Sequence, residues 1–335
     1  MTWKRSLLLI LIPGLLLGAA LFVGRYPIHP TTVIRILTSR VIPQEPTWPK
    51  AAETVIWEIR LPRAMLAVLV GGGLSISGAA FQGMFRNPLV SPDILGVSAS
   101  AGFGACLAIL LGMGPTGIQI CALVMGLVGV ILTCLLSRVH RPTPTLMLVL
   151  SGIIVGAFFS SLISAVKYLA DPYENLPAIT FWLMGSLASA STGDVKLAAP
   201  GIILGSLGLC SLGWRLNVLS MGDEEALSLG IPTEILKGQM IALATLATAS
   251  AVCVAGIIGW VGLVIPHVGR MLAGPDHRVL LPASFSLGAG YLLIIDTLAR
   301  AATRGEIPLG ILTAIIGAPF LAWLIRRTKG AWTCP

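Results

Sequence analysis

The chain has 335 residues, of which 56% are apolar and 11% are charged, and its mean hydropathy is +0.91. Soluble domains carry about 25% charged residues, so this composition excludes an ordinary soluble domain and indicates a surface that mostly faces lipid. The net charge of +8 does not indicate nucleic-acid binding, because the basic residues stand singly or in pairs at the ends of apolar runs, as they do beside membrane spans.

The apolar runs are long and unbroken, which favours spanning helices over a β-barrel, whose strands alternate weakly in pieces of about ten residues. The predicted fold class is therefore all-α: a polytopic membrane protein with a single transmembrane domain over residues 1–335 and about ten transmembrane helices of about 20 residues each. In chain order, the predicted spans are residues 6–24, 62–84, 94–112, 116–137, 144–168, 196–214, 237–256, 258–273, 281–303 and 308–325.

Three stretches differ from clean spans. The longest polar stretch is residues 25–60, which follows a first span that we interpret as an uncleaved helix because it is longer than a usual signal-peptide core. Residues 171–193 begin polar and become apolar, and residues 215–236 are polar. We therefore expect the functional surfaces outside the bilayer to involve these stretches.

The distribution of Lys and Arg predicts that both termini lie in the cytoplasm. With that orientation, twelve basic residues lie inside and ten outside, and six of the ten belong to the first outer loop. Without this loop the ratio is twelve to four. The first loop is thus an exception to the charge rule, and an acidic partner outside the membrane would explain it.

The polar stretch on the cytoplasmic side contains a short acidic segment. Gly222 and Gly230 bracket a short predicted helix, in which Asp223 and Glu224 occupy the first turn and suit the helix dipole. Pro232 suits the start of a second short helix. Two short helices in an inner loop predict a docking surface for another protein, and the alternative is a solvated loop.

Charged residues near the predicted outer ends of spans are candidate functional groups. Arg60 and Arg63 lie three residues apart and share one helix face, with interfacial snorkelling as the alternative interpretation. Asp296 lies within an apolar run, which marks it as a functional candidate. It also lies four residues before Arg300, so an ion pair on one helix face is an equal alternative.

Metal or haem ligation is conceivable at His267 and His277, which lie ten residues apart. Neither has a supporting cluster of cysteine or carboxylate residues, so a structural role is favoured. Five of the six cysteines lie inside apolar runs without metal-ligand spacing, which is typical of small buried hydrophobic residues. No catalytic residue, metal site or cofactor is predicted in this chain.

Taken together, several strings resemble the FecCD-type permease family, the membrane subunits of type II ABC importers for vitamin B12, iron-siderophores and haem in bacteria and archaea. They follow the family's order and extend over nearly the whole chain. The strings are RLPR (60–63), GLSISGAAFQGMFRNPLVSPDILGV (73–97), GDEEALSLGI (222–231), GLVIPHVGRMLAGPDHRVLLP (262–282) and EIPLGILTAIIGAPF (306–320).

The resemblance implies a permease homodimer in the cytoplasmic (inner) membrane, two separate ATP-binding-cassette ATPase subunits beneath it and a periplasmic or lipid-anchored substrate-binding protein above it. It makes residues 25–60 a periplasmic loop, and it implies that about residues 144–190 line and gate the path. It makes residues 222–230 a cytoplasmic coupling helix, with ATPase coupling at Gly222, Asp223, Glu224, Glu225, Ala226, Leu229 and Gly230. Docking of the binding protein is implied at Arg60, Arg63 and Arg300.

The chain contains no G-x-x-x-x-G-K-[ST] phosphate loop, so it is not expected to hydrolyse ATP, and a partner would supply that activity. The expected function is import by alternating access, driven by a separate ATPase. The alternative is an ion-coupled secondary transporter, which needs intramembrane charged relays; Asp296 and Lys167 are the candidates. A membrane-embedded enzyme would need a polar catalytic cluster, and the sequence indicates none.

The substrate implied by the resemblance is a metal chelate, namely a ferric siderophore, haem or cobalamin, or else an oxyanion such as molybdate. The stretch over residues 146–189 is mostly apolar or small and has no cluster of Arg or Lys that would pair with an oxyanion. This composition favours a bulky chelate mildly. Specificity is expected to reside in the binding protein.

Overall fold

A computed structural model describes residues 3–40, 42, 45–138, 144–302 and 305–327. Within these ranges the chain is helical and contains no β-strand. The elements are α1 (Trp3–Phe22), α2 (Pro30–Thr38), α3 (Lys50–Thr54), η1 (Val55–Arg60), α4 (Leu61–Met84), η2 (Pro92–Leu95), α5 (Val97–Leu110), α6 (Pro115–Ser137), α7 (Thr145–Leu169), α8 (Asn175–Leu183), α9 (Thr192–Ser211), α10 (Gly213–Leu219), α11 (Asp223–Ser228), α12 (Thr233–Ala255), α13 (Val261–Ala273), α14 (His277–Ala302) and α15 (Leu309–Arg327).

Ten of these helical segments are apolar enough to be candidates for crossing a membrane. Six are also long enough to cross a bilayer by themselves: Lys50–Met84, α6, α7, α9, α12 and α14. Four are shorter apolar helices: Ile12–Phe22, Val97–Leu110, Val261–Ala273 and Leu309–Leu324. Each of them overlaps one of the ten predicted spans, so the predicted all-α polytopic fold is confirmed.

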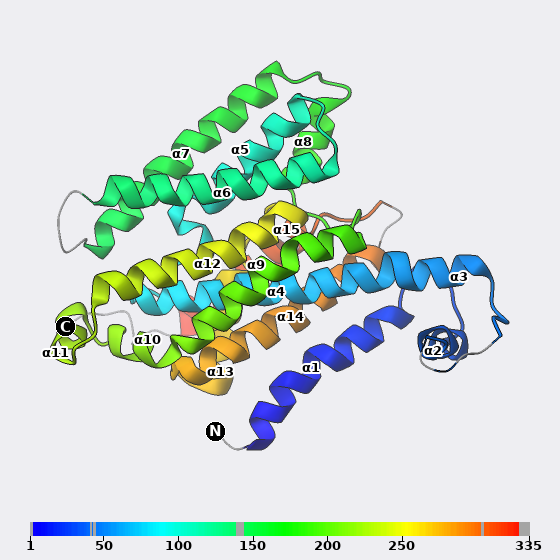
Figure 1. Cartoon of the computed structure of the whole chain (residues 1–335), viewed down its shortest axis with the longest axis horizontal. Coiled ribbons are helices and arrows are strands. Elements are labelled where there is room, and N and C mark those ends of the chain that lie inside the picture. Colours follow the sequence, from blue (N-terminus) through cyan, green and yellow to red (C-terminus); the bar gives the residue numbers. More distant parts are fainter. Residues whose placement is uncertain (1–2, 41, 43–44, 139–143, 303–304, 328–335) are drawn as a thin grey trace.

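The bundle is built around α4, which packs against α14, α12, α9 and α13. In its most apolar window, 83% of residues are buried, compared with 33% for α6 and α7, which therefore have the largest faces left for lipid or a partner. Figure 1 shows α5, α6, α7 and α8 as a group on one side of the bundle. It also shows α10 and α11 at one end, here called the α11 end, and α2 and α3 at the other, the α2 end.

Small residues on α4 allow the central helices to approach closely. A Cβ atom at Gly71 would meet the backbone carbonyl of Gly288 on α14, and one at Gly78 would meet that of Gly262 on α13. Since lipid supplies no hydrophobic drive between helices, such close backbone packing is a main source of association.

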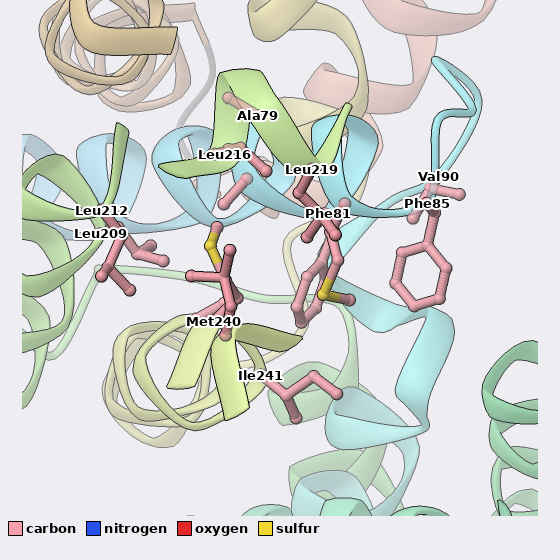
Figure 2. Packing of buried hydrophobic residues seen from close by; sticks show 14 of the residues in the cluster. Ala79, Phe81, Phe85, Val90, Leu209, Leu212, Leu216, Leu219, Met240 and Ile241 are labelled. Carbon is pink, nitrogen blue, oxygen red and sulfur yellow. The ribbon is translucent and has the colours of Figure 1, made fainter. Parts of the chain in front are cut away.

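A hydrophobic cluster at the α11 end joins α4, α10 and α12, and Figure 2 shows its side chains converging. Phe81 and Phe85 on α4 pack edge to face at 5.8 Å between ring centroids. Leu216 and Leu219 of α10 and Met240 of α12 are fully buried against them. The short helices at this end are therefore fixed to the spanning core.

The polar stretch 25–60 is more helical than the sequence suggested. It contains α2, and from residue 50 onward it is continuous with α4, so the predicted span starting at 62 begins as a helix twelve residues earlier. The helix passes Pro62 through the wide π-turn Val55–Arg60. Proline lacks an N–H group and crowds the carbonyl one turn before it, and a π-turn relieves that conflict.

The structure also corrects the prediction at Pro232. This residue is the N-cap of the long helix α12 and does not begin a second short helix. The second short helix at this end is α10, which precedes α11. A proline suits the start of any helix, and here the apolar run that follows continues for the length of a span.

Candidate coupling and docking sites

The first candidate site is α11, whose ends are set by the two predicted glycines. Gly222 is its N-cap, and Gly230 follows it with φ +76°, a conformation that favours glycine. The N–H of Gly230 donates to Leu227 O (2.9 Å) and that of Ile231 donates to Ala226 O (3.0 Å), the bond pattern of a Schellman motif. Ala226 and Ile231 are both buried in the same hydrophobic cluster as Leu216 and Met240, so this turn anchors α11 to the core.

The opposite face of α11 is open. Glu224 and Glu225 are exposed, and Leu227 and Leu229 are 53% and 63% exposed. Met221, which the sequence analysis did not single out, is exposed beside them. Exposed leucines flanked by carboxylates on an anchored helix are typical of a protein-binding surface, because large apolar side chains gain from leaving water.

Asp223 has a different role from its two acidic neighbours. Its carboxylate accepts a hydrogen bond from Lys237 Nζ at 2.6 Å, and the same ammonium donates to Thr145 Oγ1 at 3.3 Å. Lys237 is buried on α12, and Thr145 begins α7. The ion pair thus links α11 to the first turns of two spanning helices. The two residues lie 14 positions apart in different helices, so helical spacing did not predict this pair.

The second candidate site is a charge cluster at the α2 end, formed by Arg60, Arg63, Asp296, Arg300 and Glu306. Arg63 binds two carboxylates: its Nε donates to both Asp296 oxygens (2.9 and 3.1 Å), and its Nη1 donates to both Glu306 oxygens (3.0 and 2.9 Å). Arg300 Nε lies 3.4 Å from Asp296 Oδ2, which confirms the predicted ion pair on one helix face. The cluster carries one positive charge in excess of its carboxylates.

The other arginines of the charge cluster fasten the end of α1. Arg60 donates from Nη1 to Leu21 O and from Nη2 to Tyr26 O, both at 2.6 Å. Arg300 Nη2 donates to Ala20 O at 3.3 Å. Carbonyls at a helix C-terminus lack partners within their own helix, and the guanidinium groups satisfy them.

The structure brings the three predicted docking arginines together, but it places them inside the protein. Arg60 and Arg63 are each 3% exposed and Arg300 is 8% exposed. Their guanidinium groups face intrachain acceptors, so Arg60 and Arg63 are not simple snorkelling residues. Their role in docking a binding protein stays a prediction. Glu306, which the sequence analysis had not selected, completes the charge cluster.

The two histidines have structural partners. His267 Nε2 lies 2.9 Å from Pro88 O, and His277 Nδ1 lies 2.8 Å from Asn217 Oδ1, an oxygen that also accepts from the His277 backbone N–H. These contacts tie α13 and α14 to preceding elements, as the favoured interpretation expected. No group of three or more potential metal ligands is found among the described residues.

The turn before α14 contains a strongly bonded carboxylate. Asp276 accepts hydrogen bonds from the Arg278 guanidinium (2.9 Å) and from Asn217 Nδ2 (2.7 Å). Both stabilise the charged form, so they hold the pKa of Asp276 well below its usual range. This contact fixes the turn to α10 and so supports the base of α11.

The segment predicted to line the path consists of α7 and α8. The half of α7 nearer the α11 end exposes large apolar side chains such as Leu150 and Ile154. The half nearer α8 exposes Ser160, Ser161 and Ser164. The hydroxyls of Ser161 and Ser164 donate to the carbonyls of Ala157 and Ser160 one turn earlier, so they are satisfied within the helix.

Comparison with known proteins gives concordant matches over nearly the whole chain. The model of the FecCD transport family matches residues 8–327. The molybdate import system permease protein MolB of Haemophilus influenzae is 40% identical over 324 residues, which cover 97% of this chain and 94% of that one. The vitamin B12 import system permease protein BtuC of Escherichia coli O9:H4 is 35% identical over 281 residues, with 83% and 85% coverage.

A solved structure also matches. It is the inward-facing conformation of an ABC transporter assigned to the metal-chelate type. The two share 39% sequence identity with a TM-score of 0.85, and the match covers 95% of this chain and 97% of that one. The arrangement of helices described above is therefore similar to that of a known membrane transporter.

Proposed function

The chain belongs to the FecCD transport family and is an ABC importer permease, and on that premise we propose that it moves its substrate by alternating access driven by a separate ATPase. The proposed assembly is a homodimer of this chain in a bacterial or archaeal cytoplasmic membrane, with both termini inside. Two ATPase subunits bind at the α11 end, and a substrate-binding protein binds at the α2 end.

One observation carries this proposal: α11 is anchored to the core on one side and exposes its other side to solvent. Its buried side is locked by the Schellman turn, by Ala226 and by the Asp223–Lys237 ion pair. Its open side presents Glu224, Glu225 and Leu229. A helix fixed on one side and open on the other can transmit a displacement from a partner to α7 and α12, because neither the turn nor the ion pair lets it move alone.

We propose a metal chelate as the substrate class. The large apolar side chains and hydroxyls on the open face of α7 suit a bulky, largely uncharged surface that passes without tight binding. An oxyanion is the second candidate, and the similarity to the molybdate permease over 97% of this chain favours it. Elemental analysis of the ligand carried by the partner binding protein distinguishes the two, since a chelated iron or cobalt supports the first and molybdenum supports the second.

Docking of the binding protein is proposed at the charge cluster, although Arg60, Arg63 and Arg300 already have intrachain partners. The excess positive charge of the charge cluster supports a site for an acidic surface. So does Arg63 Nη2, which is buried and makes no hydrogen bond within the described part of the chain. Carboxylates of a partner would compete with Asp296 and Glu306 for the same guanidinium groups.

The coupling role of α11 is tested by reversing its exposed charges. In the double variant Glu224→Lys/Glu225→Lys, we expect the affinity for the ATPase subunit to fall by about 100-fold and substrate uptake to stop, while helicity and dimer size stay unchanged. The matched control is Glu45→Lys/Glu58→Lys, which makes the same charge change on two exposed residues at the α2 end. Unchanged ATPase binding in the α11 variant would remove the coupling assignment.

A further inference from the structure

The end of α8 and the start of α15 complete each other's hydrogen bonding. The N–H of Leu309 donates to Gly185 O at 2.8 Å, and the N–H of Gly310 donates to Met184 O at 3.1 Å. The first N–H groups and the last carbonyls of a helix have no partner within that helix. Inside a membrane protein such groups are costly to leave unpaired, so the two helix ends are held together.

The same point is fixed to α12. The N–H of Ser186 donates to Ala255 O at 2.8 Å. Gly185 has φ +72°, and a Cβ atom there would lie 2.6 Å from Ile257 O, so no other residue fits without a shift. Met184–Ser186 is therefore a junction at which α8, α12 and α15 meet through backbone contacts.

The charge cluster holds the segment that leads into this junction. Glu306 stands three residues before Leu309, and its two carboxylate oxygens accept from Arg63 Nη1. Arg63 is in turn fixed by Asp296, and it belongs to α4, which lies in the most buried of the six long spans. Glu306 is the most exposed of the ion-paired side chains in the charge cluster, at 26% compared with 4% for Arg63 and 1% for Asp296.

From this arrangement, we infer that Glu306 is a positioning residue for α8: its ion pair with Arg63 holds the first turn of α15 against the carbonyls of Met184 and Gly185. When the pair opens, the segment 305–308 loses its ion pair with α4. The hydrogen bonds that Leu309 and Gly310 donate to the end of α8 then lose their support. An acidic partner that takes Arg63 away from Glu306 would produce this opening. The inference rests on the proposed function in assigning α8 a gating role.

An open pocket beside α8 and the junction leaves space for this helix to move. A cavity of about 360 Å³ lies between α8, the turn that joins α5 to α6, and the end of α12, and Phe181, Trp182 and Cys253 contribute to its lining. Ile179 also packs α8 against α5, so release of the tie at Met184–Ser186 would let α8 tilt about that contact toward the pocket. If this side of α8 were tightly packed, the surrounding side chains would resist the tilt, because protein interiors are nearly incompressible.

Hydrogen exchange of the assembled importer in lipid nanodiscs tests the inference. In Glu306→Gln, we expect the peptides that contain Leu309 and Gly310 to exchange about tenfold faster, because a charge-assisted bond that supports them is lost. Exchange in residues 175–186 should rise in parallel. Glu58→Gln is the matched control, since Glu58 is an exposed glutamate at the same end that makes no ion pair or hydrogen bond with the described residues.

Glu306→Asp keeps the charge and should restore slow exchange at least in part, which a role in simple packing would not produce. If Glu306→Gln does not assemble, Glu306→Asp is measured alone, and the shortened side chain should give an intermediate rate. Unchanged exchange at Leu309 and Gly310 in Glu306→Gln overturns the inference; where only Glu306→Asp assembles, a rate equal to that of the native protein overturns it. Faster exchange there, with transport unaffected, would keep the junction and refute the gating role of α8, so the two failures are distinguishable.

Discussion

Replacing Asp296 with asparagine removes one negative charge from the charge cluster at almost constant shape. The carboxylate is 1% exposed, its two oxygens share the single Nε–H of Arg63, and it lies 3.4 Å from Arg300 Nε. The amide of the variant can accept from one guanidinium group, but it cannot offset the charge. Arg300 then has no carboxylate within reach among the described residues, while Arg63 keeps Glu306.

The cost follows from the burial of these groups. Removing one partner of a buried ion pair costs about 3–5 kcal/mol, because a desolvated charge is left without compensation. Since Glu306 still pairs with Arg63, we expect the lower end of this range, about 3 kcal/mol. The asparagine creates no cavity, so no packing loss is added.

Unfolding of the purified protein in mixed micelles, followed by circular dichroism during titration with dodecyl sulfate, gives the change in free energy of unfolding. Glu58→Gln serves as the control, because it removes an exposed carboxylate at the same end and should change stability by less than about 0.5 kcal/mol. A loss below about 1 kcal/mol for Asp296→Asn would refute the account of the charge cluster as a buried structural network.

Two further predictions concern pH and packing. Because its donors lower the pKa of Asp276, the carboxylate stabilises the fold fully above its unfolded pKa of about 3.9. The stability difference between the native protein and Asp276→Asn should therefore shrink as the pH falls below about 4, and it should disappear only below the lowered pKa of the folded state. Gly78→Ala should destabilise the bundle by about 1–3 kcal/mol in the same micelle titration, because the new methyl meets Gly262 O, whereas Gly238→Ala, with open space around it, should stabilise α12 by up to about 1 kcal/mol. A stability difference between the native protein and Asp276→Asn that is the same at acid and neutral pH would contradict the first prediction. Equal effects of Gly78→Ala and Gly238→Ala would contradict the second.

Much of the fold was predictable because its signals are local. Apolar runs located the ten spans, and the glycines at 222 and 230 bounded α11, since a helix end depends on residues close in sequence. Asp296 and Arg300 were predicted to pair because their four-residue spacing places them on one helix face. The helical extension before Pro62 was missed because proline usually marks a helix start, and the π-turn that accommodates it leaves no sequence signature.

The tertiary part of the candidate sites was not predictable in the same way. Arg63 lies 233 residues from Asp296 and 243 from Glu306, so neither contact follows from helical periodicity. The three arginines were therefore expected on a surface, and the structure instead places them in a buried network. The pairing of Asp223 with Lys237 likewise depends on how α11 folds back on α12.

The central claim, that this permease works by coupling to a separate ATPase, is tested most directly by uptake into proteoliposomes that contain this chain with or without the ATPase subunit. We expect uptake with ATP and both subunits present, no uptake by the permease alone, and no effect of collapsing proton or sodium gradients. Uptake by this chain alone in response to an ion gradient would contradict the claim and establish a secondary transporter instead.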